Sequence, residues 1–178
     1  MIKWCTNFGE IIMLTFDRAN ELLKYNSETG DLIWIGRTSN RIKIGDIAGA
    51  VRPDCRGYTS YIDVGIDGVR YPAHRIIWLL KTGVMPIHDI DHIDGNGLNN
   101  CWDNLRQGTR SQNLINTKMF SHNTSGYKGV SYRSDTKKWA AYIMVNKRKI
   151  NLGCYDCPKE ASDARNAYAK SEFGEWVK

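Results

Sequence analysis

The chain has 178 residues, of which 42% are hydrophobic and 25% charged, the ordinary composition of a soluble globular protein. No apolar run approaches the roughly 20 residues that a membrane span needs, and the first sixteen residues lack the apolar core of a signal peptide. We therefore expect a cytoplasmic protein that has no membrane partner. The five cysteines are scattered, and the single CxxC, Cys154 to Cys157, has no second pair beside it, so we expect neither disulfides nor a structural zinc.

The net charge of +6 is unevenly distributed along the chain. Residues 107–152 contain nine Lys or Arg and one acid, Asp135, an excess of eight that exceeds that of the whole chain. Tyrosines and a tryptophan alternate with these basic residues. A basic segment interleaved with aromatic side chains indicates a nucleic-acid partner.

The first half of the chain predicts two helices and a hairpin. Asp17 is suited to cap a helix over 18–24, and residues 27–35 predict a turn into a strand. Residues 58–71 alternate in polarity around Asp67-Gly68, a strong hairpin turn signal. Residues 73–83 then have the apolar face of a helix, with a glycine at the end.

The centre of the chain predicts the order strand, loop, strand, helix. Residues 90–93 and 105–109 are strand candidates on either side of a glycine- and asparagine-rich loop. Thr109 and Gln112 fit a capping box that opens a helix from 110 to about 118.

The last part of the chain predicts three strands and one helix. A polar, turn-rich stretch, 121–126, is followed by strand candidates over 126–133, 138–145 and 147–153, and by a helix over 158–174. The predicted fold class is therefore α+β.

Residues 89–101 hold three aspartates and one histidine within their first six positions. A calcium loop is excluded, because Ile93 falls at an oxygen-ligand position whether Asp89 or Asp91 begins the loop. No GxSxG elbow supports a hydrolytic triad. A carboxylate pair for glycoside chemistry stays open on spacing, but it would not account for the basic segment.

A metal-assisted site fits this stretch better. At a strand end Asp91 can ligate a hard divalent cation, while His92 remains available as a base. Asn113, in the first turn of the predicted helix, offers a neutral oxygen that suits Mg²⁺ or Mn²⁺ and is weak for zinc. Few protein ligands, supplemented by phosphate oxygens and water, are how Mg²⁺ is held in phosphoryl chemistry.

The string D91-H92-I-D-G-N, followed by D103-N104-L105-R106 and T109-R-S-Q-N113, resembles the HNH (ββα-metal) endonucleases. Its spacing is similar to that of phage homing endonucleases in which asparagine replaces the last histidine. The resemblance implies a ββα-metal core over 89–118, one Mg²⁺ (or Mn²⁺) held by Asp91 and Asn113, His92 as the general base, and Asn104 as a residue that braces the loop and orients His92. The implied products carry a 5′-phosphate and a 3′-hydroxyl.

The stretches SGYKGVSYR, KWAAYI, INLGCYD and KEASDARNAYA resemble the ethylene-response-factor (APETALA-type) DNA-binding domain. That family has a three-stranded antiparallel sheet backed by one helix, and its sheet reads the major groove. The resemblance implies that six outward-facing residues of the sheet contact DNA: Lys128, Arg133, Lys138, Tyr142, Lys149 and Asn151.

Together these observations predict a metal-dependent HNH endonuclease of homing type that hydrolyses double-stranded DNA. The expected domains are a small α+β segment (1–57), the nuclease domain (58–120) and the sheet-and-helix DNA-binding domain (121–178). A single site favours a monomer that nicks one strand, although a double-strand cut remains open. If the protein is phage-encoded, it would act in the cytoplasm of a bacterial host. The alternative is a sequence-specific DNA-binding regulator with an inactive nuclease core.

Overall fold

The computed structural model describes residues 13–53, 60–116, 119 and 123–177. By their internal contacts the residues form two compact units. The first comprises the chain up to residue 86 together with 96–105, and the second comprises 87–95 and the chain from 106 onward. The three domains expected from the sequence remain a prediction.

The first unit contains two small antiparallel sheets and two α-helices. Strands β1 and β2 pair with each other, β3, β4 and β5 form a meander, and α1 contacts α2. Its most deeply buried side chains are aliphatic and come from both helices and both sheets. The elements are α1 (Phe16–Leu22), β1 (Leu23–Tyr25), β2 (Leu32–Trp34), β3 (Ala50–Arg52), β4 (Tyr61–Ile66), β5 (Val69–Pro72), α2 (Ala73–Thr82) and the 3-10 turn η1 (Trp102–Asn104).

The first helix differs from its prediction at both ends. Thr15, not Asp17, is the N-cap, because its hydroxyl accepts a hydrogen bond from the Arg18 N–H at 3.2 Å. Asp17 lies in the first turn, where a carboxylate interacts favourably with the helix dipole. The helix also ends earlier, at Leu22, because Leu23 begins the strand that pairs with β2.

The predicted second helix is confirmed, as is the predicted hairpin from residue 60 onward; residues 58 and 59 lie outside the described residues. Asp67 and Gly68 both have positive φ, 49° and 81°, as a tight two-residue turn between β4 and β5 requires. Gly83 ends α2 at φ 79° and donates its N–H to the Leu79 carbonyl at 2.8 Å.

The strand, loop, strand, helix order at the centre of the chain is confirmed as β6 (Asp89–His92), β7 (Leu105–Gly108) and α3 (Arg110–Asn116). Strands β6 and β7 form a two-stranded sheet. The capping box is present: Gln112 donates its N–H to the Thr109 hydroxyl at 3.3 Å, and the Gln112 side chain accepts from the Thr109 N–H at 2.7 Å. The expected last residues of this helix, 117 and 118, lie outside the described residues.

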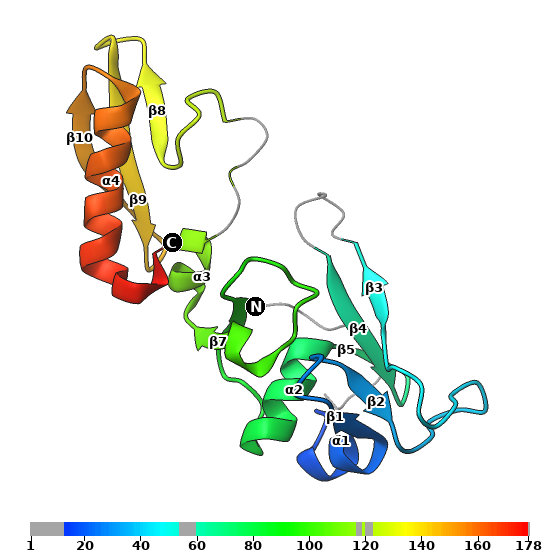
Figure 1. Ribbon diagram of the computed structural model, residues 1–178. Helices are drawn as coiled ribbons and strands as arrows, with labels where there is room; N and C mark the ends of the chain where they lie inside the picture. The colour runs from blue at the N-terminus through cyan, green and yellow to red at the C-terminus, as the bar shows by residue number, and fades with distance from the viewer. Residues whose placement is uncertain (1–12, 54–59, 117–118, 120–122, 178) are drawn as a thin grey trace. The chain divides into compact units, whose positions relative to one another are not determined.

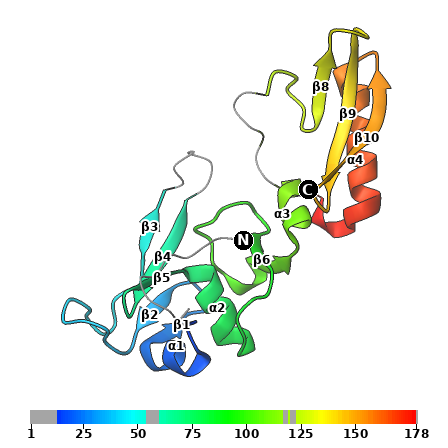
Figure 2. The ribbon, with the colours of Figure 1, turned by 180° about the vertical axis from the view of Figure 1, so that it is seen from behind.

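The C-terminal part is a three-stranded antiparallel sheet in the order β10-β9-β8, with one helix lying along one of its faces (Figures 1 and 2). The elements are β8 (Val130–Arg133), β9 (Lys138–Val145), β10 (Arg148–Tyr155), α4 (Pro158–Phe173) and the 3-10 turn η2 (Gly174–Trp176). Strand alternation predicts that five residues face the helix, and all five pack in the clusters that contain Ala161 and Ala169 of α4: Trp139, Ala141, Ile143, Ile150 and Leu152. The α+β prediction is confirmed.

The CxxC belongs to this sheet-and-helix arrangement. Cys154 is exposed on β10, whereas Cys157 is the N-cap of α4 and its sulfur accepts from the Glu160 N–H at 3.4 Å. In the described part of the chain, no helix is both long and apolar enough to cross a membrane.

Candidate active site

The side chains of strand β6 alternate between a buried face and a partly exposed face. Ile90 and His92 face the buried side, and His92 is only 5% exposed, whereas Asp89 and Asp91 on the other side are partly exposed. The strand ends immediately, because Gly95 at φ 76° turns the chain back and donates its N–H to the His92 carbonyl at 2.8 Å. The adjacent Asp91 and His92 therefore leave the strand on opposite faces, with the imidazole largely shielded from bulk water.

Asp91 is held by an arginine of the neighbouring strand. The Arg106 Nε and Nη2 both donate to Asp91 Oδ2, at 3.1 and 3.0 Å, and the two side chains are only 20% and 14% exposed. The same guanidinium lies 3.9 Å from the centroid of the Trp176 ring and donates to the Glu175 carbonyl at 3.3 Å. Arg106 thus fixes the position of the candidate metal ligand and is itself held by the η2 segment.

Arg106 has no predicted role beyond its place in the motif. The available signal was alternation on β7, which puts it on one face of a strand that returns beside Asp91. No feature of the sequence predicts its contact with Trp176, because the two residues lie far apart along the chain.

A second arginine approaches the same acidic face of β6. Arg110 of α3 lies 3.3 Å from Asp89 Oδ2, but both side chains are substantially exposed. An exposed pair of this kind contributes little to stability. Its consequence is electrostatic: the two carboxylates on this face of the strand each have an arginine beside them.

Asn113 lies in the first turn of α3, the helix that contacts β6. Its backbone N–H donates to the Thr109 carbonyl at 3.0 Å, but its side-chain Oδ1 is buried and has no hydrogen-bond partner among the described residues. A buried acceptor left unsatisfied costs about 1–3 kcal/mol. An amide oxygen of this kind, in the same unit as a carboxylate, fits a hard divalent cation.

The donor set is sparse. Among the described residues, no three or more His, Cys, Asp or Glu side chains converge on one point, which is the arrangement zinc prefers. One carboxylate and one amide oxygen instead suit Mg²⁺ or Mn²⁺, which keep water and substrate oxygens as their remaining ligands.

Asn104 lies in the first unit, whereas Asp91, His92 and Asn113 lie in the second. Its Nδ2 donates to the Asn99 carbonyl at 2.8 Å and its backbone N–H donates to the Cys101 carbonyl at 3.0 Å. These bonds lie within the loop that follows β6, and the role of Asn104 in bracing that loop remains a prediction. Its effect on the orientation of His92 remains a prediction.

The residues expected to face DNA are distributed over the outer face and the edges of the C-terminal sheet. Lys149 lies over the Tyr142 ring at 4.1 Å, and Asn151 is the cross-strand partner of Tyr142. Arg133 binds Asp135 at 2.8 Å, a hydrogen bond that lowers the pKa of that carboxyl. Lys138 lies 3.2 Å from the exposed Asp156.

Lys128 is oriented differently from the other five. Its ammonium group donates to the carbonyls of Leu114 and Ile115 at 2.9 and 2.7 Å, near the end of α3. The reason is position: Lys128 precedes β8, which begins at Val130, so strand alternation does not control its side chain.

Comparison with known proteins bears on the centre of the chain. Residues 71–115, from the end of β5 to α3, match the family model described as HNH endonuclease. Protein 3.8 of Escherichia phage T7 is 36% identical over 84 residues, which are 47% of this chain and 69% of that protein. The uncharacterized HNH endonuclease L560 of Acanthamoeba polyphaga mimivirus is 31% identical over 123 residues, 68% of this chain and 61% of that protein. No solved structure matches the chain significantly.

Proposed function

Since the chain belongs to the family of phage T7 Protein 3.8 and carries an HNH endonuclease domain at residues 71–115, we propose that it is a metal-dependent DNA endonuclease of homing type. The observation that carries the proposal is the buried Oδ1 of Asn113, which has no hydrogen-bond partner among the described residues. Asn113 lies on the helix that contacts the strand of Asp91 and His92. A nuclease domain implies DNA as the substrate. The reaction is hydrolysis of a phosphodiester to 5′-phosphate and 3′-hydroxyl ends.

In this mechanism His92 is the general base that removes a proton from the attacking water. An imidazole has an unperturbed pKa of about 6.5, which suits that role near neutral pH. His92 lies on the buried side of β6, where packing would limit reorganisation of the ring when substrate binds.

Asp91 and Asn113 would hold one Mg²⁺ or Mn²⁺. When bound, this cation stabilises the negative charge that develops on the phosphate and on the leaving 3′ oxygen. Arg106 keeps the Asp91 carboxylate in position through two hydrogen bonds to Oδ2. Asn104 would brace the loop after β6 and help to orient His92.

The C-terminal sheet would bind double-stranded DNA as an ethylene-response-factor-like module. Its exposed face carries Lys149, Asn151 and the Tyr142 ring, while Arg133 and Lys138 lie at the strand ends. Lysine and arginine contacts to phosphate set affinity, whereas contacts to base edges set the sequence that is read. A sheet face of this composition supports both kinds of contact.

Plasmid cleavage with titrated Mg²⁺ tests the proposal, with nicked and linear products scored separately. We expect His92→Ala to abolish cleavage and Asp91→Ala to abolish its response to metal. His88→Ala is the matched control, because His88 is exposed and lies just before β6. Parental cleavage by His92→Ala would show that another group is the base. Metal-independent retardation of DNA without any cleavage would favour the DNA-binding regulator instead.

A further inference from the structure

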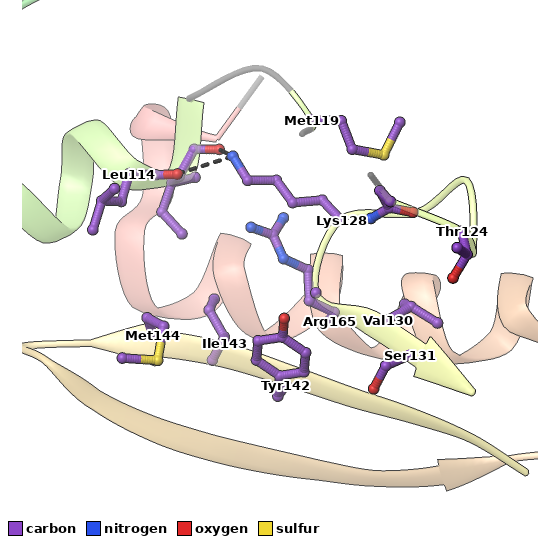
Figure 3. A pocket seen from close by; sticks show the side chains of 13 residues that line it. Leu114, Met119, Thr124, Lys128, Val130, Ser131, Tyr142, Ile143, Met144 and Arg165 are labelled. Carbon is purple, nitrogen blue, oxygen red and sulfur yellow. Dashed lines mark hydrogen bonds between the residues drawn. The ribbon is translucent and has the colours of Figure 1, made fainter. Parts of the chain in front are cut away.

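A cavity of about 350 Å³ lies within the second unit, between the end of α3 and the β8 side of the C-terminal sheet (Figure 3). Its walls come from α3, the loop before β8, strand β9 and helix α4. Several lining residues, including Ser131 and Met144, are solvent-exposed, so the cavity is accessible from outside. The proposed nuclease mechanism does not use it.

Arg165 of α4 is buried against this cavity and is only 6% exposed. Its Nη1 donates to the neutral Asn166 side chain at 3.1 Å, but its Nε is buried and has no hydrogen-bond partner among the described residues. In Figure 3 the guanidinium projects from α4 into the cavity, beneath the Lys128 side chain, and the Tyr142 hydroxyl points toward it. A buried guanidinium normally has a carboxylate or another anion beside it.

Lys128 brings a second positive charge into the same space. Burial and the nearby Arg165 charge lower the pKa of Lys128 to about 8, even though its ammonium donates to two carbonyls of α3. Burial likewise lowers the pKa of Arg165. Burial therefore destabilises the charged form of both groups, and an anion bound in the cavity would reduce this desolvation penalty.

The described residues around the cavity provide no counter-charge. None of the described residues that line the cavity is acidic, and the sequence contains no Asp or Glu between residues 104 and 134. The fixed, planar guanidinium suits a tetrahedral oxyanion, because it can donate two hydrogen bonds to neighbouring oxygens.

We propose that this cavity is a phosphate-binding site that takes one phosphate of the DNA backbone, with Arg165 and Lys128 as its cations and Tyr142 as a hydroxyl donor. The inference rests on the DNA binding of the proposed function and adds a specific contact to it. Tyr142 connects the cavity to the outer sheet face, since its ring also carries Lys149. A strand lying on that face can therefore place one phosphate in the cavity.

The site also adjoins the helix that carries Asn113. Lys128 binds the carbonyls of Leu114 and Ile115, the two residues that follow Asn113 along α3. A phosphate bound by Lys128 is thus one side chain away from the helix of the candidate metal ligand. Binding of DNA at the sheet would then be linked, through α3, to the position of Asn113 at the candidate metal site.

The test measures DNA affinity between 50 and 200 mM salt, in EDTA and on a His92→Ala background, so that the DNA stays intact. We expect Arg165→Gln to weaken binding about tenfold and to lower the slope of log affinity against log salt by about 0.9, the loss of one phosphate contact. Lys128→Met should act in the same direction. Lys159→Gln, an exposed lysine at the start of the same helix, is the matched control and should leave both quantities unchanged.

A second set of measurements distinguishes a phosphate of the DNA backbone from free inorganic phosphate. Duplexes with single methylphosphonate substitutions should contain one position that weakens binding of the parental chain but not of Arg165→Gln. Thermal unfolding in inorganic phosphate, compared with chloride at equal ionic strength, should show stabilisation that Arg165→Gln lacks. Stabilisation by phosphate with no sensitive position in DNA would overturn the backbone assignment in favour of a free anion.

The inference fails if Arg165→Gln and Lys128→Met fold and bind DNA with the parental affinity and salt slope. Plasmid cleavage by the chain with an intact His92 would in that case leave the nuclease proposal standing. Absence of both cleavage and DNA binding in the parental chain would instead refute the proposed function. If Arg165→Gln does not fold, Lys128→Met decides the outcome.

Discussion

Asn113→Ala should distinguish two effects of the buried Asn113 amide: its cost to the stability of the fold and its role as a metal ligand. The Asn113 Oδ1 is buried without a partner among the described residues, an arrangement that costs about 1–3 kcal/mol. Truncation removes that cost and only a small amount of packing. We therefore expect the free energy of unfolding in EDTA to stay within about 1 kcal/mol of the parental value, or to rise.

The divalent cation should stabilise the parental chain much more than Asn113→Ala. At a concentration one hundred times its Kd, a ligand that binds only the folded state raises the free energy of unfolding by about 2.7 kcal/mol. The parental chain should gain this stability in Mg²⁺, whereas Asn113→Ala should gain much less and should lose plasmid cleavage. Urea unfolding with EDTA and with Mg²⁺ measures both values.

Asn123→Ala is the matched control, because this asparagine is fully engaged. Its Oδ1 accepts from the Gly126 N–H and the Ser125 hydroxyl, both at 2.9 Å, and its Nδ2 donates to the Tyr127 carbonyl at 2.9 Å. Its removal should cost about 1–3 kcal/mol in EDTA. A loss of similar size in Asn113→Ala would mean that Asn113 is hydrogen-bonded within the protein, and parental Mg²⁺ stabilisation together with parental cleavage would refute its role as a ligand.

Four further changes test other parts of the structure. The pKa of Lys128 is about 8 in the folded chain against 10.5 ordinarily, so between pH 8 and 10 the unfolded chain binds more protons than the folded chain. Relative to Lys128→Met, the parental free energy of unfolding should therefore rise from pH 8 to 10 by at most about 3 kcal/mol, and by less after solvent screening. A difference between the two chains that does not change with pH would contradict this. Arg106→Gln should lose about 1–3 kcal/mol in urea unfolding and slow plasmid cleavage, because Asp91 loses its anchor. Trp176→Leu should lose about 1 kcal/mol of cation–π stacking and keep cleavage, so equal cleavage by both variants would show that Arg106 does not position Asp91. Gly68→Ala should lower the free energy of unfolding in urea by about 1 kcal/mol, because Gly68 has a φ of 81°. An unchanged free energy of unfolding would mean that the turn adopts another conformation.

Local chemistry accounts for the elements that could be predicted. Asp67-Gly68 and the Thr109–Gln112 box each act within four residues, so their effect does not depend on the rest of the fold. Alternation along β9 likewise predicted which residues pack against α4. The start of the first helix was wrong because Thr15 and Asp17 both can cap, and only the hydrogen bond to Arg18 distinguishes them.

The candidate site divides in the same way. Asp91, His92 and Asn113 could be proposed from residue type and spacing, because the chemistry of a hard cation and a base restricts which side chains serve. The hold of Arg106 on Asp91 could not, since it depends on the pairing of β6 with β7. Likewise, the hydrogen bonds of Lys128 to carbonyls of α3 could not be predicted, because they join separate elements.

The amino-acid sequence by itself therefore determined the secondary structure over most of the described residues, the α+β class and the residue types available for chemistry. These follow from periodicity, capping and turn preferences, which are properties of neighbouring residues. Only the tertiary structure decided the partners of the charged and polar groups. Arg106 lies beside Asp91, Lys128 binds the end of α3, and the buried Arg165 Nε has no hydrogen-bond partner among the described residues. The physical reason is that a side-chain partner is set by distance in space, and no periodic pattern in the sequence encodes a contact between residues far apart along the chain.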